Sequence, residues 1–432
     1  HLLIIWKRAQ KELINSMASK ILIVGGGASG YMAAITAAAI DRDLQVLIAE
    51  KTLNTLSKVR ISGGGRCNVT HQPYEVDVFA QNYPRGHRFL KKILYEFGPD
   101  DTIQWFERRG VALKTETDGR MFPVSNKSES IINCLQQEVS TLGVEVKTKY
   151  GVEHFELEKK NGINSFKVTF SDGTIGSFDK VLIATGGYPK ASGFDWIRSH
   201  ELEISDPAPS LFTFNSPSNP ICSLLGVAVS EARIKILGSK LEWAGPLLIT
   251  HWGFSGPAIL KLSAWGARIL KERDYNFEIL INWISNIDKK DIREELTRLR
   301  DNKSKALVSS NSKFNLPGRL WKFLVIEAGI SEEKIWADLS NKALESLIIK
   351  LTEHRHQIKG KTTFKEEFVT CGGISLSEID HNTMESKKIK GLYFSGEVID
   401  VDGITGGFNF QNAWSTGFTA GKAMASEKSL SD

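Results

Sequence analysis

The chain has 432 residues, of which 41% are hydrophobic and 24% are charged, as in ordinary globular proteins. This composition excludes disordered, collagen-like and coiled-coil classes, and no apolar run approaches the ~20 residues that span a bilayer. The formal net charge is only +5, so we expect neither a membrane nor nucleic acid as a partner. Four widely spaced cysteines without a CxxC pair favour reduced thiols and a cytoplasmic location over a disulfide or zinc scaffold.

The first predicted unit of structure is a βαβ motif. We interpret residues 1–16 as an extension without a part in the function, because Met17 stands just before the first strong strand. The apolar segment Lys20–Val24 predicts that strand, and a glycine-rich turn and an alanine-rich helix follow it. A second apolar strand, Leu44–Ala49, ends at Glu50. This order predicts a parallel sheet with right-handed crossovers.

The turn after the first strand has the fingerprint of a dinucleotide-binding site. Gly25, Gly27 and Gly30 have the GxGxxG spacing, and Glu50 follows twenty residues after the last glycine. Gly25 permits the tight turn, Gly27 lets a pyrophosphate approach the backbone, and Gly30 lets the helix pack closely on the sheet. The helix N-terminus suits a diphosphate. Glu50 is expected to accept hydrogen bonds from the adenosine ribose, but the fingerprint alone does not distinguish NAD from FAD.

Further elements follow up to residue 189. A glycine-rich loop is predicted at Ser62–Asn68, and the apolar spacing in Ser128–Leu142 predicts a helix. Strand patterns follow at Val144–Lys149, Val152–Leu157, Phe166–Phe170 and Val181–Ala184.

The character of the sequence changes after Pro189. Prolines and short strand-like runs lead to a helical pattern at Ser255–Leu270, and residues 289–356 are charged with helical periodicity. His354 and His356 lie beyond a charged helix and are predicted to be solvated. Strands and glycine loops return from Phe368 onward. We therefore predict that residues 190–365 are an insertion with a β part and a helical part.

Several motifs together resemble one family. They are Lys58–Asn68, Gly119–Pro123, Leu248–Pro257, Thr370–Gly373 and Gly396–Asn409. From Ser19 to Ala425 the chain is similar to a bacterial flavoprotein family of NAD(P)/FAD-dependent oxidoreductases, which includes BaiN-type bile-acid reductase and aminoacetone oxidase. It departs from the family pattern after Gly187, where the stretch is short and lacks the glycine-serine-threonine-glycine segment that members often carry.

The resemblance implies an α/β fold with a Rossmann-like FAD-binding domain of the two-dinucleotide-binding-domain type. That domain, residues 17–189 and 366–432, would be interrupted by a β-barrel-like domain at 190–285 and a helical subdomain at 286–365. One FAD would be bound. Together with the fingerprint, the resemblance assigns these residues to it: Gly25, Gly27, Ala28, Ser29, Gly30, Glu50, Lys51, Lys58, Ser62, Gly63, Gly64, Gly65, Arg66, Cys67, Asn68, Val152, Ala184, Thr185, Gly186, Gly187, Gly396, Glu397, Gly403, Gly406, Gly407, Phe408 and Asn409.

We therefore expect an FAD-dependent oxidoreductase that transfers hydride through flavin N5 to or from a small-molecule substrate. NAD(P)H as a transient electron donor and oxygen as an acceptor both stay open. NAD(P)H would have to bind without a fingerprint of its own, because the sequence has no second one. Cys67 is interpreted as a small buried thiol beside the cofactor. The alternative function is a flavin-containing RNA-binding or interaction protein, with the charged helical insertion as its partner surface.

His251 is the candidate for proton handling. It lies in the block Thr250–Pro257 of the insertion, and substrate sites in such enzymes lie between the flavin and the inserted domain. A histidine satisfied by local backbone groups is the alternative interpretation. No metal site is predicted, because no pair of histidines has ligand spacing.

Overall fold

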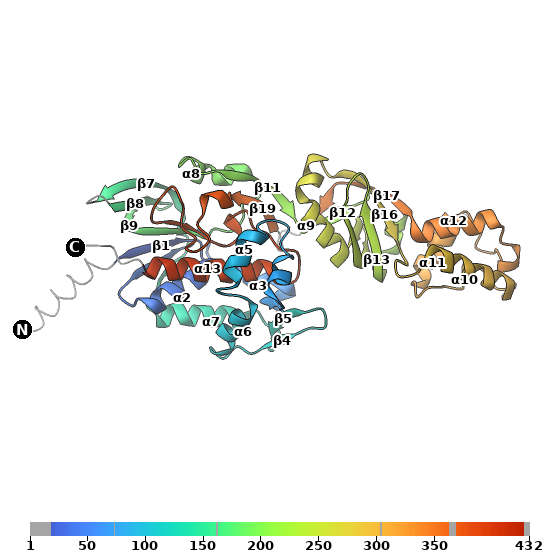
Figure 1. The fold of residues 1–432 in the computed structure, drawn as a ribbon, viewed down its shortest axis with the longest axis horizontal. Helices are drawn as coiled ribbons and strands as arrows, with labels where there is room; N and C mark the ends of the chain where they lie inside the picture. Colours follow the sequence, from blue (N-terminus) through green and yellow to red (C-terminus); the bar gives the residue numbers. More distant parts are fainter. Residues whose placement is uncertain (1–18, 73, 161–162, 303–304, 363–368, 427–432) are drawn as a thin grey trace, which may run out of the picture. The chain divides into compact units, whose positions relative to one another are not determined.

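The computed structural model divides into two compact units. Unit 1 comprises residues 1–208 and 369–432, and unit 2 comprises residues 209–368. The structure describes residues 19–72, 74–160, 163–302, 305–362 and 369–426 (Figure 1). The predicted extension at residues 1–16 lies outside the described residues.

A five-stranded parallel sheet with the order β20-β10-β1-β2-β6 organises unit 1. Its strands are β1 (Lys20–Val24), β2 (Gln45–Ala49), β6 (Glu145–Lys147), β10 (Lys180–Ile183) and β20 (Leu392–Phe394). The inner strands β10, β1 and β2 are short, apolar and almost fully buried, as expected where both faces of a parallel sheet are covered. The predicted Rossmann-like parallel sheet is therefore confirmed.

Two helices rich in small residues, α2 (Ala28–Ile40) and α13 (Phe408–Ser426), lie side by side in unit 1 (Figure 1). A Cβ atom on Gly417 would lie 2.5 Å from the Ser29 carbonyl oxygen, and one on Gly421 would lie 2.4 Å from another α2 carbonyl oxygen. Only glycine permits this approach. The last helix of the chain therefore packs directly on the first helix of the dinucleotide fold.

Smaller elements complete unit 1. Two three-stranded antiparallel sheets contain β3 (Thr70–His71), β5 (Arg120–Pro123) and β4 (Leu113–Thr115), and β7 (Val152–Lys160), β8 (Ile163–Phe170) and β9 (Ile175–Phe178). The helices are α3 (Ser57–Gly65), α4 (Val76–Ala80), α5 (His87–Leu94), α6 (Pro99–Glu107) and α7 (Glu129–Thr141), with short 3-10 turns η4 (Leu376–Glu378) and η5 (Gly396–Val398). The helix predicted at Ser128–Leu142 is confirmed as α7.

Residues 190–208 belong to unit 1, so the domain boundary lies at Pro209 instead of the predicted residue 190. The segment contains η1 (Ala191–Phe194), α8 (Asp195–Arg198) and most of β11 (Ile204–Ser210), which pairs with β19 (Val369–Ile374). The His200 ring stacks on Phe155 with centroids 4.0 Å apart, and Phe194 meets Tyr188 at 4.7 Å. The change of composition that gave the predicted boundary at residue 190 does not reveal these aromatic contacts with unit 1.

A seven-stranded antiparallel sheet organises unit 2, with the order β17-β16-β13-β14-β15-β12-β18. Its strands are β12 (Thr213–Asn215), β13 (Ala228–Ile236), β14 (Glu242–Thr250), β15 (Gly253–Ser255), β16 (Asn276–Asn282), β17 (His354–Lys359) and β18 (Lys361–Thr362). The Ser216 hydroxyl donates to the Gln357 carbonyl oxygen at 2.7 Å, which links the end of β12 to β17. Strands β12 to β16 lie within residues 190–285, for which a β-barrel-like domain is predicted, whereas β17 and β18 lie within residues 286–365, for which a helical subdomain is predicted.

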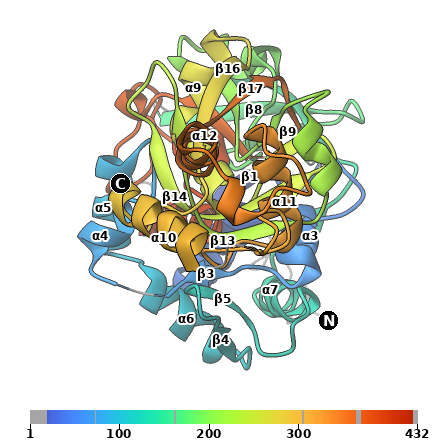
Figure 2. The ribbon, with the colours of Figure 1, turned by 90° about the vertical axis from the view of Figure 1, so that its right-hand side faces the viewer.

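Four helices accompany this sheet: α9 (Pro257–Glu272), α10 (Lys289–Asn302), α11 (Gly318–Glu327) and α12 (Asn341–Thr352), with 3-10 turns η2 (Pro220–Leu224) and η3 (Trp336–Asp338). Helix α12 packs against both α10 and α11 (Figure 2). The helices share one apolar core with the sheet, which includes the fully buried Trp283, Trp321 and Trp336. The periodicity of residues 289–356 thus marks helices with one apolar face.

His354 and His356 are buried, not solvated as predicted. Their exposed fractions are 3% and 4%, because β17 alternates buried and exposed residues and both histidines lie on its inner face. The charged helix α12 ends at Thr352, before the strand begins. Burial lowers the pKa of His354 to about 4, and the Lys350 ammonium adds to this effect.

Candidate functional site

The carboxyl ends of four neighbouring strands in unit 1 bring distant segments together. β1 is followed by Gly25–Gly30, β2 by Glu50, β10 by Ala184–Gly187 and β20 by Ser395–Glu397. Since the strands are parallel, these segments lie at one edge of the sheet, which is where open α/β sheets bind their ligands. The Ser29 hydroxyl donates to the Ser395 hydroxyl at 2.6 Å across this edge.

The fingerprint turn leaves room for a ligand at one position and none at another. A Cβ on Gly30 would lie 2.1 Å from the Gly25 carbonyl oxygen, whereas a Cβ on Gly27 would meet no protein atom within 4 Å. Helix α2 begins immediately after this turn without a side-chain cap. Its N-terminus can therefore donate backbone hydrogen bonds to a phosphate group lying over Gly27.

Glu50 ties the end of β2 to the fingerprint turn. Its Oε2 atom accepts from the Gly26 N–H at 2.9 Å, and its Oε1 atom accepts from the Thr52 N–H at 2.7 Å. Each carboxylate oxygen can accept a further hydrogen bond. A Cβ on Gly151 would lie 3.0 Å from Lys51 Cβ, so β7 and its first residue, Val152, begin beside the end of β2.

The predicted glycine loop Ser62–Asn68 begins inside α3. The backbone leaves the helical conformation at Ser62 and is left-handed at Gly63 and Gly64, with φ of +59° and +70°. Added Cβ atoms on Gly64 and Gly65 would meet no protein atom within 4 Å. The loop therefore presents open backbone, as a site for a bulky ligand requires.

The Arg66 side chain forms an ion pair, and the Cys67 side chain is buried. Arg66 Nη1 lies 2.6 Å from Glu116 Oε1, and the guanidinium carbon lies 4.0 Å from the centre of the Phe122 ring. Cys67 is fully buried, and burial raises the pKa of its thiol to about 12. Cys67 is therefore an uncharged thiol at neutral pH, in keeping with a packing role.

Glu397 connects three further segments. Its Oε2 atom lies 2.5 Å from Lys58 Nζ, and its Oε1 atom accepts from the Thr370 N–H at 2.9 Å. A Cβ on Gly187 would lie 3.0 Å from the same Oε1 atom. The buried Thr370 hydroxyl has no hydrogen-bond partner among the described residues, so a polar ligand atom would satisfy it. Our sequence interpretation did not include Thr370, whose only signal is its place in the block Thr370–Gly373.

The start of α13 is held rigidly. Gly406 and Gly407 have positive φ angles, and a Cβ on Gly407 would lie 2.4 Å from the Thr70 carbonyl oxygen. The Asn409 side chain accepts from the Gly403 N–H at 2.8 Å and donates to the Gly403 carbonyl oxygen at 2.9 Å. These contacts position the N-terminus of α13 beside β3.

Four polar or aromatic side chains lie at that helix start. The Asn68 amide, with its oxygen toward Gly407, accepts from the Gly407 N–H at 2.9 Å. The buried Phe408 ring lies 4.8 Å from the ring of His71. Asn412, one turn further along α13, is buried, and its Oδ1 atom has no hydrogen-bond partner in the described part of the chain. Asn412 was not predicted, and helical spacing from Phe408 is the signal that points to it.

Arg85 forms a buried ion pair that the sequence did not reveal. Its guanidinium donates two hydrogen bonds to the fully buried carboxylate of Asp402, beside Gly403. Arg85 therefore does not belong to a solvated basic face, although the run of basic residues in Arg85–Arg88 suggests one. The paired arrangement anchors the loop that leads to α13.

His251 lies in unit 2, whereas every predicted cofactor residue lies in unit 1. It occupies the turn between β14 and β15 with an exposed side chain, and its ring lies 4.0 Å from that of Trp252. The Thr250 hydroxyl accepts from the Gly253 N–H at 3.2 Å and fixes this turn. The role of His251 in proton transfer stays a prediction.

Comparison with known proteins places this geometry in context. Residues 19–423 match the model of the HI0933-like protein Rossmann domain. A 3-dehydro-bile acid delta(4,6)-reductase from Clostridium scindens is 29% identical over 415 residues, which cover 94% of this chain and 99% of that protein. A ribosomal RNA dihydrouridine synthase from Escherichia coli is 28% identical over 417 residues, which cover 94% of this chain and 98% of that protein.

Among solved structures, the 3-ketosteroid-delta4-(5alpha)-dehydrogenase from Rhodococcus jostii RHA1 in complex with 4-androstene-3,17-dione aligns with a TM-score of 0.50. Its sequence is 12% identical, and the alignment covers 95% of this chain and 97% of that one. This likeness concerns the fold. Within the described residues, no helix is both long and apolar enough to cross a membrane, and no three potential metal ligands cluster.

Proposed function

Because this chain belongs to the HI0933-like family of Rossmann-domain proteins, and is an oxidoreductase with the FAD-binding fold, we propose that it reduces a carbon–carbon double bond conjugated to a carbonyl group. The observation that carries the proposal is the meeting of four strand-end segments and the start of α13 in unit 1. Bound FAD would supply hydride transfer at its N5 atom. The residues of this edge would bind and orient the cofactor.

The donor set of this edge fits FAD. The N-terminus of α2 and the open space over Gly27 suit the pyrophosphate, and Glu50 keeps acceptor capacity for ribose hydroxyls. The open glycines of Ser62–Asn68 suit a large planar group. Two buried polar atoms, Thr370 Oγ1 and Asn412 Oδ1, have no partner among the described residues and would be satisfied by a polar ligand.

We assign the adenosine half of FAD to Gly25–Gly30, Glu50, Lys51 and Val152, and the flavin half to the segments around Lys58–Asn68, Ala184–Gly187 and Gly396–Asn409. The N-terminus of α13 carries a partial positive charge and free N–H groups. Placed at the pyrimidine edge of the flavin, it would stabilise negative charge that develops there on reduction. The Asn68 and Asn409 contacts keep this helix start in position without reorganisation.

The substrate class comes from the relatives. The name of the Clostridium scindens protein denotes reduction of double bonds in a 3-keto bile acid, and that of the Escherichia coli protein denotes reduction of uridine. Both reactions saturate a double bond conjugated to a carbonyl. We propose a small conjugated ketone as the substrate of this chain, NAD(P)H as the electron donor and the cytoplasm as its location. Uridine in ribosomal RNA is the second candidate, which the relative of that name supports.

The experiment records the visible spectrum of the full-length protein, adds NADH or NADPH without oxygen, and then adds an acceptor. We expect a flavin spectrum that one nucleotide bleaches and that a steroid dienone restores, while the matched saturated ketone does not. Recovery with uridine-containing ribosomal RNA alone would favour the second candidate. Absence of flavin even after FAD is added, or recovery with neither acceptor, would overturn the proposal.

A further inference from the structure

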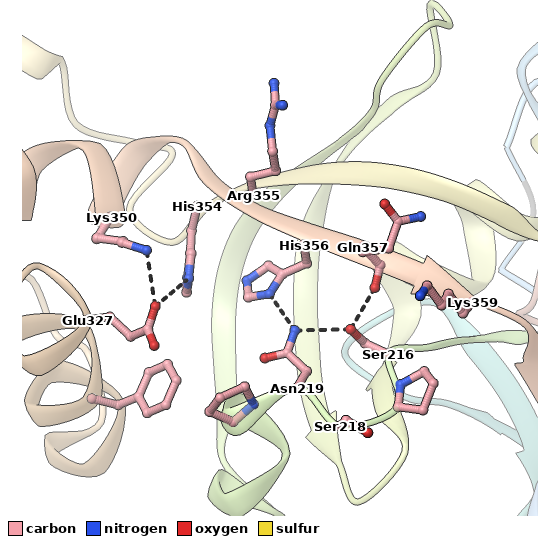
Figure 3. A pocket seen from close by; sticks show the side chains of 13 residues that line it. Ser216, Ser218, Asn219, Glu327, Lys350, His354, Arg355, His356, Gln357 and Lys359 are labelled. Atoms are coloured by element: carbon pink, nitrogen blue, oxygen red, sulfur yellow. Dashed lines mark hydrogen bonds and ion pairs between the residues drawn. The ribbon is translucent and has the colours of Figure 1, made fainter.

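Unit 2 contains a cavity of about 300 Å³ that no assignment above uses. The loop 216–220, strand β17 and helices α11 and α12 line it (Figure 3). Its polar wall includes His354, His356, Asn219, Glu327 and Lys350. None of these residues belongs to the proposed cofactor site.

The hydrogen bonds of Asn219 determine which nitrogen of His356 carries the proton. Asn219 Oδ1 accepts from the Ile221 N–H at 3.1 Å, so the amide nitrogen faces the ring. That nitrogen donates to His356 Nδ1 at 2.9 Å and to the Ser216 hydroxyl at 3.0 Å. Nδ1 therefore accepts, and the ring proton of neutral His356 is on Nε2. Burial holds the pKa of His356 well below its ordinary value, with His354 and Lys350 adding to the effect, so the neutral form dominates.

The Nε2–H group of His356 has no acceptor. The side chain is 4% exposed, and Nε2 is buried without a hydrogen-bond partner among the described residues. A buried donor without an acceptor costs free energy. An acceptor atom that enters the cavity beside His356 would remove this cost.

His354 repeats this arrangement on the same strand. Trp283 Nε1–H donates to His354 Nδ1 at 3.2 Å, which puts the ring proton of neutral His354 on Nε2 as well. That nitrogen lies 4.0 Å from Glu327 Oε2, beyond hydrogen-bond distance. The two rings are neighbours, with centroids 4.0 Å apart (Figure 3). The cavity wall thus presents two fixed N–H donors.

One pair of charged side chains lies beside these donors. Lys350 Nζ lies 3.1 Å from Glu327 Oε2, the only carboxylate in the lining, whereas the exposed Arg355 and Lys359 alternate with the histidines along β17, and Figure 3 shows Arg355 pointing away from them. The Lys350 ammonium is therefore the cation on the side of the two N–H donors, and it favours a negatively charged acceptor that can take the place of Glu327. The donors also argue against a metal ion, because both Nδ1 atoms are occupied and no three potential metal ligands cluster among the described residues.

We propose that this cavity binds an oxyanion group, carboxylate or phosphate, through His356 Nε2–H and the Lys350 ammonium. The ligand accepts the orphaned hydrogen bond of His356 and competes with Glu327 for Lys350. Since the cavity is larger than a bare ion requires, the oxyanion belongs to a small molecule.

The test titrates inorganic phosphate and, separately, acetate into the full-length protein with ¹⁵N-labelled histidine, with sodium chloride added to hold ionic strength constant. We expect saturable movement of the His354 and His356 ring signals while the exposed His251 signal stays in place. The oxyanion that binds more tightly identifies the ligand as a phosphate ester or a carboxylate. If neither produces saturable movement, the proposal is overturned.

Variants separate binding from a structural effect. Lys350→Met should weaken the affinity by about tenfold or more, as expected when a charge-assisted hydrogen bond is lost. Glu327→Gln should strengthen it, because the competing carboxylate is neutralised. Lys342→Met, an equal charge change on the exposed part of α12, should leave it unchanged. Equal weakening by both lysine variants, or weaker binding in Glu327→Gln, would contradict the proposal.

Discussion

The two units bring their polar groups together in different ways. In unit 1, parallel strands end at one edge, and each supplies a short segment such as Gly25–Gly30 or Glu50. In unit 2, one antiparallel strand supplies His354 and His356 by simple alternation, and helices supply the neighbouring charges. A ligand that touches backbone requires glycine, so the first arrangement leaves a motif in the sequence. A cavity wall made of side chains does not require glycine, so the second arrangement leaves no motif in the sequence.

The largest expected effect comes from two glycines in the same turn. Gly30→Ala places a Cβ 2.1 Å from a backbone oxygen, so we expect a loss of about 3 kcal/mol or more of folding stability. A Cβ added at Gly27 meets no protein atom within 4 Å, so in Gly27→Val the fold should persist while FAD retention is lost. Urea unfolding and flavin absorbance measure the two effects. A Gly27→Val protein that purifies fully flavinated would contradict the placement of the pyrophosphate.

In unit 2, His354 should make stability sensitive to acid. Its folded pKa of about 4 lies below the ordinary value of 6.5, so the unfolded chain binds more protons between these values. The contribution is complete above pH 6.5 and decreases by about 3 kcal/mol as pH falls through this window toward 4. Urea midpoints at pH 7.5 and 4.5 should therefore differ less in His354→Phe than in the parent protein. The control is His251→Phe on an exposed site of the same unit, and equal acid dependence in all three proteins would contradict the prediction.

Glu50→Gln tests the ribose contact of unit 1. The amide retains one acceptor oxygen for the turn but loses the charge, so we expect FAD to bind about 10- to 100-fold more weakly. Fluorescence titration of the apoprotein with FAD measures this. Unchanged affinity at unchanged stability would show that Glu50 serves only the Gly26 and Thr52 backbone.

The smallest effect concerns thiol reactivity. Cys67 is buried with a pKa raised to about 12, whereas Cys222 of unit 2 is only partly buried. Iodoacetamide at pH 8 should therefore modify Cys222 first and leave Cys67 intact in the native protein. Mass spectrometry of labelled peptides checks the order. Rapid modification of Cys67 would indicate an accessible thiolate at the proposed flavin site.

Local sequence patterns predicted many of the helices and strands, but not all of the tertiary contacts around them. The strands around Gly25–Gly30, helix α7 and the helices of residues 289–356 were predicted because their apolar spacing depends on residues within one or two turns. The boundary at residue 190 was wrong, because the aromatic contacts of His200 and Phe194 with unit 1 join separate parts of the sequence. The burial of His354 was missed because strand alternation was not recognised beyond α12.

By itself the sequence determined the βαβ unit, the glycine fingerprint with Glu50, and the motifs that resemble a flavoprotein family. These features depend on backbone geometry within short segments, which leaves a readable spacing. Only the tertiary structure decided that Arg85 pairs with Asp402, 317 residues away, and that Asn412 and His356 keep buried polar atoms without partners. Such pairings depend on where distant segments meet, because a side chain's charge and hydrogen bonds act over a few ångströms in space, whatever the separation along the chain.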